Sequence, residues 1–152
     1  MDPATGPGTD PGTEDALLLA AARLVMAVTT RAADQVGDLS PVQLRALTVL
    51  DQLGTANLVQ LTEAMDVTAS TTSRLVDRLV AADLVDRRPS ETTRREIALR
   101  LTGAGATVLA RYDELRVAGL RNRIAGLGSA DRATVLAGLA TLVGAEGPAA
   151  PG

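Results

Sequence analysis

The side chains best suited to chemistry in this sequence are arginines and hydroxyl residues gathered between residues 68 and 100. Every basic residue is arginine, and residues 70–100 hold seven arginines against five acidic residues. The rest of the chain holds eight against thirteen, which gives the whole sequence a net charge of −3. Guanidinium groups bind phosphates and guanine edges. The position of the positive charge, rather than its total, therefore indicates a surface that could contact nucleic acid.

The sequence lacks the residues that redox, zinc-dependent and triad-based chemistry require. The sequence contains no Cys and no His, which excludes disulfides, thiol redox chemistry, Cys/His zinc sites and His-dependent catalytic triads. The cluster Gly103-Ala104-Gly105 follows an expected strand, but it lacks the glycine spacing and the lysine of a phosphate-binding loop. We therefore expect a protein that is not an enzyme and that needs no cofactor or metal.

Residues 56–82 have the pattern of a helix-turn-helix. The first helix, 56–65, has an apolar face at spacings of three and four residues. Residues 66–68 form the turn, and the Thr68 hydroxyl is placed to accept from backbone N–H groups near Thr71. In the second helix, 69–82, the expected buried face consists of Thr72, Leu75, Val76 and Leu79. The expected exposed face consists of Ala69, Ser70, Ser73, Arg74, Asp77 and Arg78.

A β-hairpin is expected directly after this helix. Residues 84–88 read as one strand, residues 89–93 as a turn and residues 94–101 as a second strand. In the second strand Ile97, Leu99 and Leu101 alternate with Ala98 and Arg100, the period of a half-buried strand. A helix-turn-helix followed by a hairpin is a winged helix.

Long apolar helices are expected on both sides of the winged helix. They cover residues 13–36, 41–53, 103–125 and 130–144. The second has Ser40 as N-cap and Pro41 at its first position, and the last has Ser129 as N-cap. With no Phe or Trp and only Tyr112 as an aromatic, the core must be Leu, Val and Ala, which favours packed helices. The apolar stripe of 13–36 is wider than one neighbour needs. It fits either a central core helix or a helix that also packs on a second subunit.

The ends of the chain have no capacity to form a core. Residues 1–12 and 145–152 are rich in Pro, Gly and Ala, and we expect both to be disordered tails. The first twelve residues lack the basic and apolar regions of a signal peptide. No apolar run approaches the roughly 20 residues of a membrane span. A soluble, cytoplasmic protein with no membrane association is therefore expected.

Residues 40–116 resemble the MarR family of bacterial transcription regulators. The resemblance rests on LSPVQLRALTVL, on LVQLTEAMDVTASTTSRLVDRLVAADLVDRR and on RREIALRLTGAG, whose Leu-Thr-x-x-Gly follows the wing in register. Two residues depart from the family pattern. Thr93 stands where family wings commonly have Asp, and Thr72 stands where the family often has Val, so its hydroxyl needs a partner.

The resemblance implies a mainly α fold with a small hairpin wing. Residues 40–102 would form the winged helix-turn-helix DNA-binding domain, and 13–39 with 103–144 would supply dimerisation helices. The family layout is a homodimer on near-palindromic double-stranded DNA, often a repressor that small phenolic or lipophilic ligands release. Candidate DNA-binding residues are Thr68, Ala69, Ser70, Ser73, Arg74, Arg78, Arg88, Arg94 and Arg95. Candidate ligand-pocket residues are Met26, Arg31, Leu47, Leu50 and Tyr112.

Each candidate has a simpler interpretation. Arg74 and Arg78 could instead pair with Asp77 or Asp83 on a solvated helix, although the small residues before Arg74 favour close approach to a major groove. Adjacent strand residues point to opposite faces, so only one of Arg94 and Arg95 should enter a groove, and we favour Arg94. Arg87 and Arg88 are expected to divide between internal ion pairs and phosphate contact.

The ligand pocket is the weaker hypothesis. Met26, Leu47 and Leu50 are more simply explained as core residues, and Tyr112 as a buried tyrosine whose hydroxyl has a partner. The alternative function is a winged-helix module that binds another protein without specific DNA binding. Gel shifts over a salt series would separate the two functions.

Overall fold

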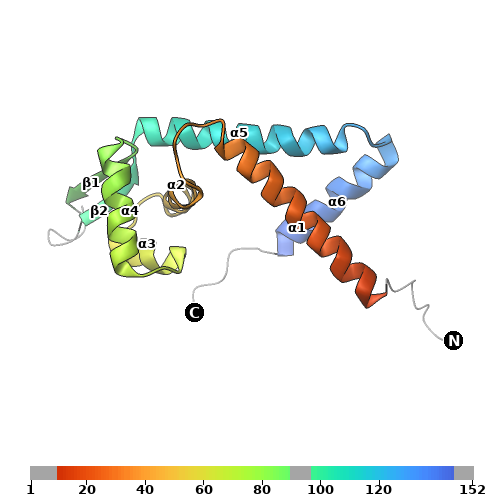
Figure 1. Ribbon diagram of the computed structural model, residues 1–152, viewed down its shortest axis with the longest axis horizontal. Helices are drawn as coiled ribbons and strands as arrows, with labels where there is room; N and C mark the ends of the chain where they lie inside the picture. The colour runs from red at the N-terminus through yellow and green to blue at the C-terminus, as the bar shows by residue number, and fades with distance from the viewer. Residues whose placement is uncertain (1–9, 90–96, 146–152) are drawn as a thin grey trace. The chain divides into compact units, whose positions relative to one another are not determined.

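A computed structural model of the chain describes residues 10–89 and 97–145. Within these ranges the fold is mainly α with one small antiparallel hairpin, as the sequence predicts (Figure 1). The helices are α1 (Pro11–Ala33), α2 (Pro41–Leu53), α3 (Leu58–Met65), α4 (Ala69–Ala81), α5 (Gly103–Ile124) and α6 (Ser129–Ala145), and the strands are β1 (Val85–Pro89) and β2 (Ile97–Leu101). Most of the two expected tails, 1–9 and 146–152, lies outside the described residues.

The chain divides into two compact units after residue 116. The first unit contains α1 to α4, the hairpin and the first part of α5. The second contains the remainder of α5 and α6. The candidate nucleic-acid residues that the structure describes all belong to the first unit.

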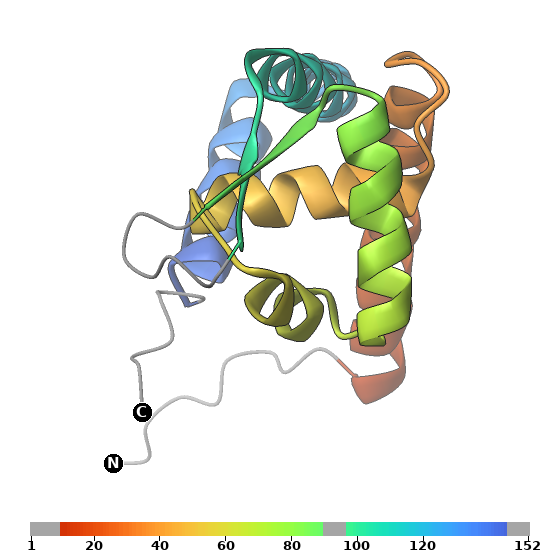
Figure 2. The same cartoon turned by 90° about the vertical axis from the view of Figure 1, so that its left-hand side faces the viewer.

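The main core of the first unit is built from non-aromatic side chains, as the composition predicts. Helices α2, α3 and α4 surround it together with the hairpin (Figure 2). Its fully buried side chains include Leu47, Leu50, Leu61, Met65, Val76 and Leu79. The helix-turn-helix is thus held by packing of one face of each helix, not by any aromatic residue.

Two helices of this unit begin with reciprocal capping boxes. At the start of α2 the Ser40 hydroxyl accepts from the backbone of Gln43, while the Gln43 side chain accepts from the backbone of Ser40. Asn57 and Gln60 make the same exchange at the start of α3. The expected Ser40 cap is confirmed, and α3 begins at Leu58, two residues later than expected.

The hairpin is anchored to the helices at one end. Its register pairs Val85 with Leu101 and Pro89 with Ile97. Leu99 is buried and forms an additional bridge with Ala56, which precedes α3. The expectation that Ile97 faces the core is wrong, because its position opposite Pro89 lies beyond the packed helices and leaves it 57% exposed.

Only the end of α1 is packed within its unit. Ala32 and Ala33 lie in a second small core with Leu44, Leu109 and Tyr112. Most of the preceding apolar stripe is exposed, with Leu17 at 62%. The interpretation of α1 as a central core helix is therefore wrong for most of its length. The helix also begins at Pro11, two residues before the predicted start.

One described helix, α1, is long and apolar enough to cross a membrane by length and composition. The expectation that no apolar run approaches such a span is wrong on this count. Core helices of soluble proteins and signal sequences pass the same test.

The second unit exposes its apolar residues. Helix α6 runs from Ser129 to Ala145, so it begins at the residue that the sequence placed at its N-cap and ends one residue later than predicted. Its exposed large side chains are Val135, Leu136, Leu139, Leu142 and Val143.

Candidate nucleic-acid interface

The turn between α3 and α4 is fixed by backbone conformation and by a cap. Asp66 ends α3 with φ of 50° and ψ of 51°, a left-handed conformation that short polar side chains tolerate. The Thr68 hydroxyl then accepts from the backbone N–H of Thr71 at 3.3 Å, as the sequence predicts. It also lies 3.1 Å from the Ser70 hydroxyl and 2.9 Å from the Thr71 hydroxyl. The N-terminal end of α4 thus carries a cluster of exposed hydroxyls.

Helix α4 has one buried and one exposed face. The four positions expected to face the core are all buried, and Thr72 is the buried polar one. Its hydroxyl donates to the Thr68 carbonyl at 3.2 Å, which satisfies within the helix the hydrogen bond that this residue requires. On the other face Ala69, Ser70, Arg74, Asp77 and Arg78 are exposed, and Ser73 is half-buried.

Asp77, in the middle of the exposed face, pairs with a residue outside α4. Its Oδ1 atom lies 2.5 Å from Nη2 of Arg87 on β1. The alternative in which Asp77 pairs with Arg74 or Arg78 is therefore not what the structure shows. Among the described residues neither of these two arginines forms an ion pair. Arg74 and Arg78 thus present their guanidinium groups on an exposed helix face.

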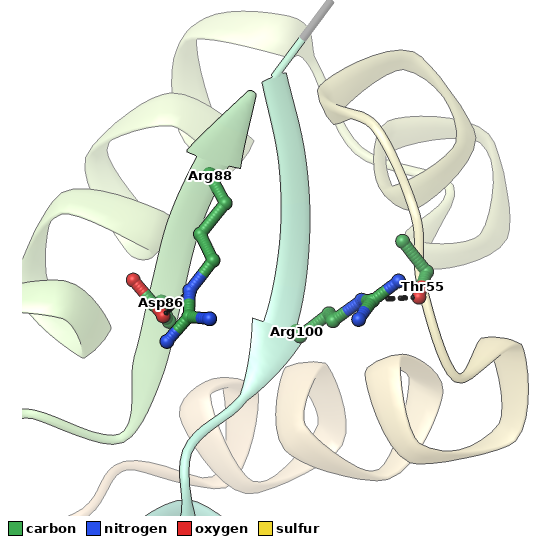
Figure 3. A network of polar contacts seen from close by, with 4 residues as sticks. All are labelled: Thr55, Asp86, Arg88 and Arg100. Carbon is green, nitrogen blue, oxygen red and sulfur yellow. Dashed lines mark hydrogen bonds and ion pairs between the residues drawn. The ribbon is translucent and has the colours of Figure 1, made fainter. Parts of the chain in front are cut away.

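The next arginine of the hairpin, Arg88, also forms an ion pair. Arg88 Nε donates to Asp86 Oδ2 at 2.5 Å, and the Arg88 side chain stays 75% exposed (Figure 3). Arg87 and Arg88 both take part in ion pairs, whereas the sequence suggested that they would divide between pairing and phosphate contact. Arg88 has enough exposure to exchange its partner for a phosphate. The candidates Arg94 and Arg95, and the departure Thr93, lie outside the described residues.

Arg100 ties β2 to the segment before α3. Its Nε donates to the Thr55 hydroxyl at 2.7 Å (Figure 3). On the hairpin it is the cross-strand partner of Asp86. Sequence reasoning missed this contact and the Arg87–Asp77 pair, since each joins residues on different elements. The Asn57–Gln60 capping box was also missed, although its Asn-x-x-Gln spacing could have revealed it.

The candidate ligand-pocket residues lie in different surroundings. Leu47 and Leu50 are fully buried in the main core, as their simpler interpretation holds. Tyr112 is buried in the second core, with the Arg116 guanidinium 5.1 Å from its ring centre. Met26 is 69% exposed on α1, so its interpretation as a core residue is wrong. Arg31 is exposed near the end of the same helix.

Comparisons with known proteins agree with the geometry of the winged helix. The sequence profile of the MarR family matches residues 39–97. Among curated proteins, none matches the chain.

Solved structures are similar over most of the chain, and three of them serve as examples. RV1404 from Mycobacterium tuberculosis is 34% identical with a TM-score of 0.81, over 95% of this chain and 99% of that one. A MarR family protein from Bacillus stearothermophilus is 25% identical with a TM-score of 0.73, over 91% and 96%. A mutant of MepR from S. aureus, solved bound to an oligodeoxyribonucleotide, is 16% identical with a TM-score of 0.68, over 87% and 96%.

The match of the family profile covers the helix-turn-helix and β1. The 34% identity extends the likeness over nearly the whole chain. The chain therefore belongs to the MarR family of transcriptional regulators.

Proposed function

We propose that this protein binds double-stranded DNA in a sequence-specific manner and acts as a homodimeric repressor on a near-palindromic operator. One observation carries the proposal: α4 is the second helix of a helix-turn-helix, begins after the Thr68 cap, and presents Arg74 on an exposed face that begins with small residues. Small side chains let the backbone approach the floor of a major groove. There a guanidinium can make a bidentate contact with guanine.

The residues divide between base recognition and phosphate binding. Ser70, Ser73 and Arg74 lie on the first two turns of α4, where recognition helices contact base edges. Arg78 lies one turn further along and contacts a phosphate. Hydroxyls at the start of the helix, including that of Thr68, add phosphate contacts with the support of free backbone N–H groups. Arg88 and, from the sequence, Arg94 with Arg95 supply the wing contacts to phosphate or minor groove.

Dimerisation is supported by the exposed apolar side chains outside the winged helix. We assign residues 40–102 to DNA binding, and 13–39 with 103–144 to the dimer. Leu17, Leu18 and Leu19 on α1 are all at least half exposed, as are Leu142 and Val143 on α6. Burying such side chains stabilises an assembly by about 1.5–3 kcal/mol each. A second copy of the chain supplies the matching apolar surface.

Repression and its release rest on family membership. Repression follows when a dimer occupies an operator that overlaps a promoter, and a small lipophilic or phenolic ligand would release it. Tyr112 and Arg31 are the residues that offer polar contacts to such an anion. No described residue requires a ligand, so a constitutive DNA-binding protein in the cytoplasm is also compatible with the proposal.

The test is selection of binding sites from random double-stranded DNA, followed by gel shifts of the selected site over a salt series. We expect a near-palindromic sequence and an affinity that falls linearly with log salt concentration. Selection of no sequence, together with absence of binding at low salt, would reject DNA binding. That outcome would favour a winged helix whose partner is another protein.

A further inference from the structure

The end of α4, the proposed recognition helix, and the start of α5 meet at a tight joint. Helix α4 ends at Ala81, and Asp83 then adopts a left-handed backbone with φ of 57°. The backbone N–H of Leu84 donates to the Leu79 carbonyl at 2.9 Å, which closes the end of the helix. Leu84 is buried. The backbone of Asp83 and Leu84, which the start of α5 contacts, therefore follows directly from the end of α4.

One side chain bridges the two helices. The Thr102 hydroxyl donates to the Asp83 carbonyl at 2.6 Å and accepts from the Gly105 N–H at 2.9 Å. The backbone N–H of Thr102 donates to the Leu84 carbonyl at 3.1 Å. Thr102 thus caps α5 and also holds its first turn to the two residues that follow α4. An ordinary N-cap side chain accepts hydrogen bonds only from backbone N–H groups of the helix that it begins.

Gly105 makes the joint closer than any other residue would allow. A Cβ atom on Gly105 would lie 2.1 Å from the Leu84 carbonyl oxygen and 3.0 Å from its carbon. These are backbone atoms, so a rotamer change cannot relieve the overlap. Gly103, two residues earlier in the same turn, has nothing within 4 Å of its Cβ position. The close approach therefore belongs to one glycine and not to the glycine-rich segment as a whole.

We propose that Thr102 and Gly105 are positioning residues for DNA binding: they fix the direction in which α5 leaves the recognition helix, and so set the spacing of the two recognition helices. The inference rests on the proposed dimer. The part of α5 that belongs to the first unit, residues 103–116, is about 21 Å long. A tilt of about 10° at the joint displaces the end of this part by roughly 4 Å. The two half-sites of an operator lie about 34–36 Å apart, and neighbouring base pairs lie about 3.4 Å apart. This tilt would therefore change the half-site spacing that the proposed dimer binds best.

The experiment compares two pairs of variants on the selected operator, on a single half-site, and on operators with one or two base pairs inserted or removed at the centre. Gly105→Ala introduces the clash, and Gly103→Ala is the matched control in open space. Thr102→Val removes the bridging hydroxyl at nearly constant shape, and Thr102→Ser retains it. Circular dichroism and thermal unfolding check that each variant is folded.

We expect Gly103→Ala and Thr102→Ser to keep the wild-type spacing preference. Gly105→Ala and Thr102→Val should bind the natural spacing at least tenfold more weakly, prefer another spacing or none, and bind the single half-site within about twofold of wild type. Thr102→Val carries the test if Gly105→Ala does not fold.

Two results would overturn the proposal while leaving DNA binding intact. One is an unchanged spacing preference in folded Gly105→Ala and Thr102→Val. The other is an equal loss of affinity for the half-site and for every operator, which would mean that the joint only supports the winged helix. If wild-type protein selects no DNA sequence, the proposed function itself fails.

Discussion

Asp77 of α4 and Arg87 of β1 are joined by an ion pair of 2.5 Å. The Asp77 side chain is 58% exposed and that of Arg87 is 37% exposed, so water screens the attraction and its contribution to stability is small. Its electrostatic effect is of more consequence. Asp77 is an acidic residue on a face that we assign to DNA, and its pairing with Arg87 offsets the repulsion that a phosphate would meet there.

Replacing Asp77 with Asn should therefore change binding more than stability. The free energy of unfolding should fall by less than about 1 kcal/mol. The released Arg87 should strengthen binding to unrelated DNA and steepen the slope of log affinity against log salt by up to about 1. Fluorescence anisotropy with a labelled random duplex over a salt series measures both quantities.

Asp113→Asn is the matched control for this change. Asp113 forms a similar exposed pair with Arg116, at 3.1 Å, but it lies on α5 outside the winged helix. The same charge change there should leave the salt slope unaltered. Equal slopes for the two variants would show that only net charge matters and that Asp77 has no special place at the interface.

Arg74 and Arg78 should differ in the kind of affinity they supply. Arg74→Ala should cost about 1–3 kcal/mol on the selected operator and relax the preference at one base pair in each half-site. Arg74→Lys keeps the charge but loses the planar fork, so it should lose the same preference. Arg78→Ala should weaken binding to all sequences alike and reduce the salt slope by about 1.

A panel of operators with single base-pair changes, titrated at fixed salt, separates these outcomes. A uniform loss for Arg74→Ala across the panel would assign Arg74 to phosphate. If the loss of affinity for Arg78→Ala were confined to operators changed at one base pair, base recognition would belong to Arg78.

Thr72→Val tests whether the buried hydroxyl stabilises the fold. The Thr68 carbonyl accepts from the Thr72 hydroxyl at 3.2 Å and also from the Thr72 backbone N–H at 3.0 Å. Valine removes the hydroxyl but leaves no carbonyl unpaired and retains the shape. We expect a free energy of unfolding within about 1 kcal/mol of wild type, since a net hydrogen bond is worth little when no partner is orphaned. Denaturant unfolding measures it, and a loss above about 2 kcal/mol would contradict this account.

Leu17→Glu tests the role of α1 in self-association. Leu17 is 62% exposed, and two copies of the substitution would enter a symmetric dimer. The loss of two buried leucines, at about 1.5–3 kcal/mol each, should weaken the dimer at least 100-fold. Val59→Glu on α3 is the control, because Val59 is equally exposed at 63% but lies in the winged helix. Sedimentation equilibrium should show dissociation of the first variant only, and an undisturbed Leu17→Glu dimer would remove α1 from the interface.

The parts of the fold that follow from local pattern were predictable. The period of α4 identified its four buried positions, and Thr68 was identified as its cap, because both depend on neighbours within one turn. Other features depend on partners far along the chain. Arg100 bonds Thr55 across 45 residues and Arg87 reaches back to Asp77, and no spacing rule indicates either contact.

Two predictions differ from the structure, the first for a local reason and the second for a tertiary one. The start of α1 was placed at Thr13 because Pro and Gly usually indicate a loop, yet proline is favourable at the first position of a helix. Alternation assigned Ile97 to the inner face of the hairpin. It could not show that the core ends at Leu99, because that depends on where Ala56 and α3 lie against β2.

The bridge between Ala56 and Leu99 has a consequence for how the protein meets other chains. The Leu99 N–H donates to the Ala56 carbonyl at 2.7 Å and its carbonyl accepts from the Ala56 N–H at 3.1 Å. These bonds occupy the outer edge of β2 at its most buried residue. An open edge there would be a template on which a foreign strand could add and aggregation could begin. The bridge closes β2 to such a strand at Leu99, so the proposed dimer is left to the helical surfaces.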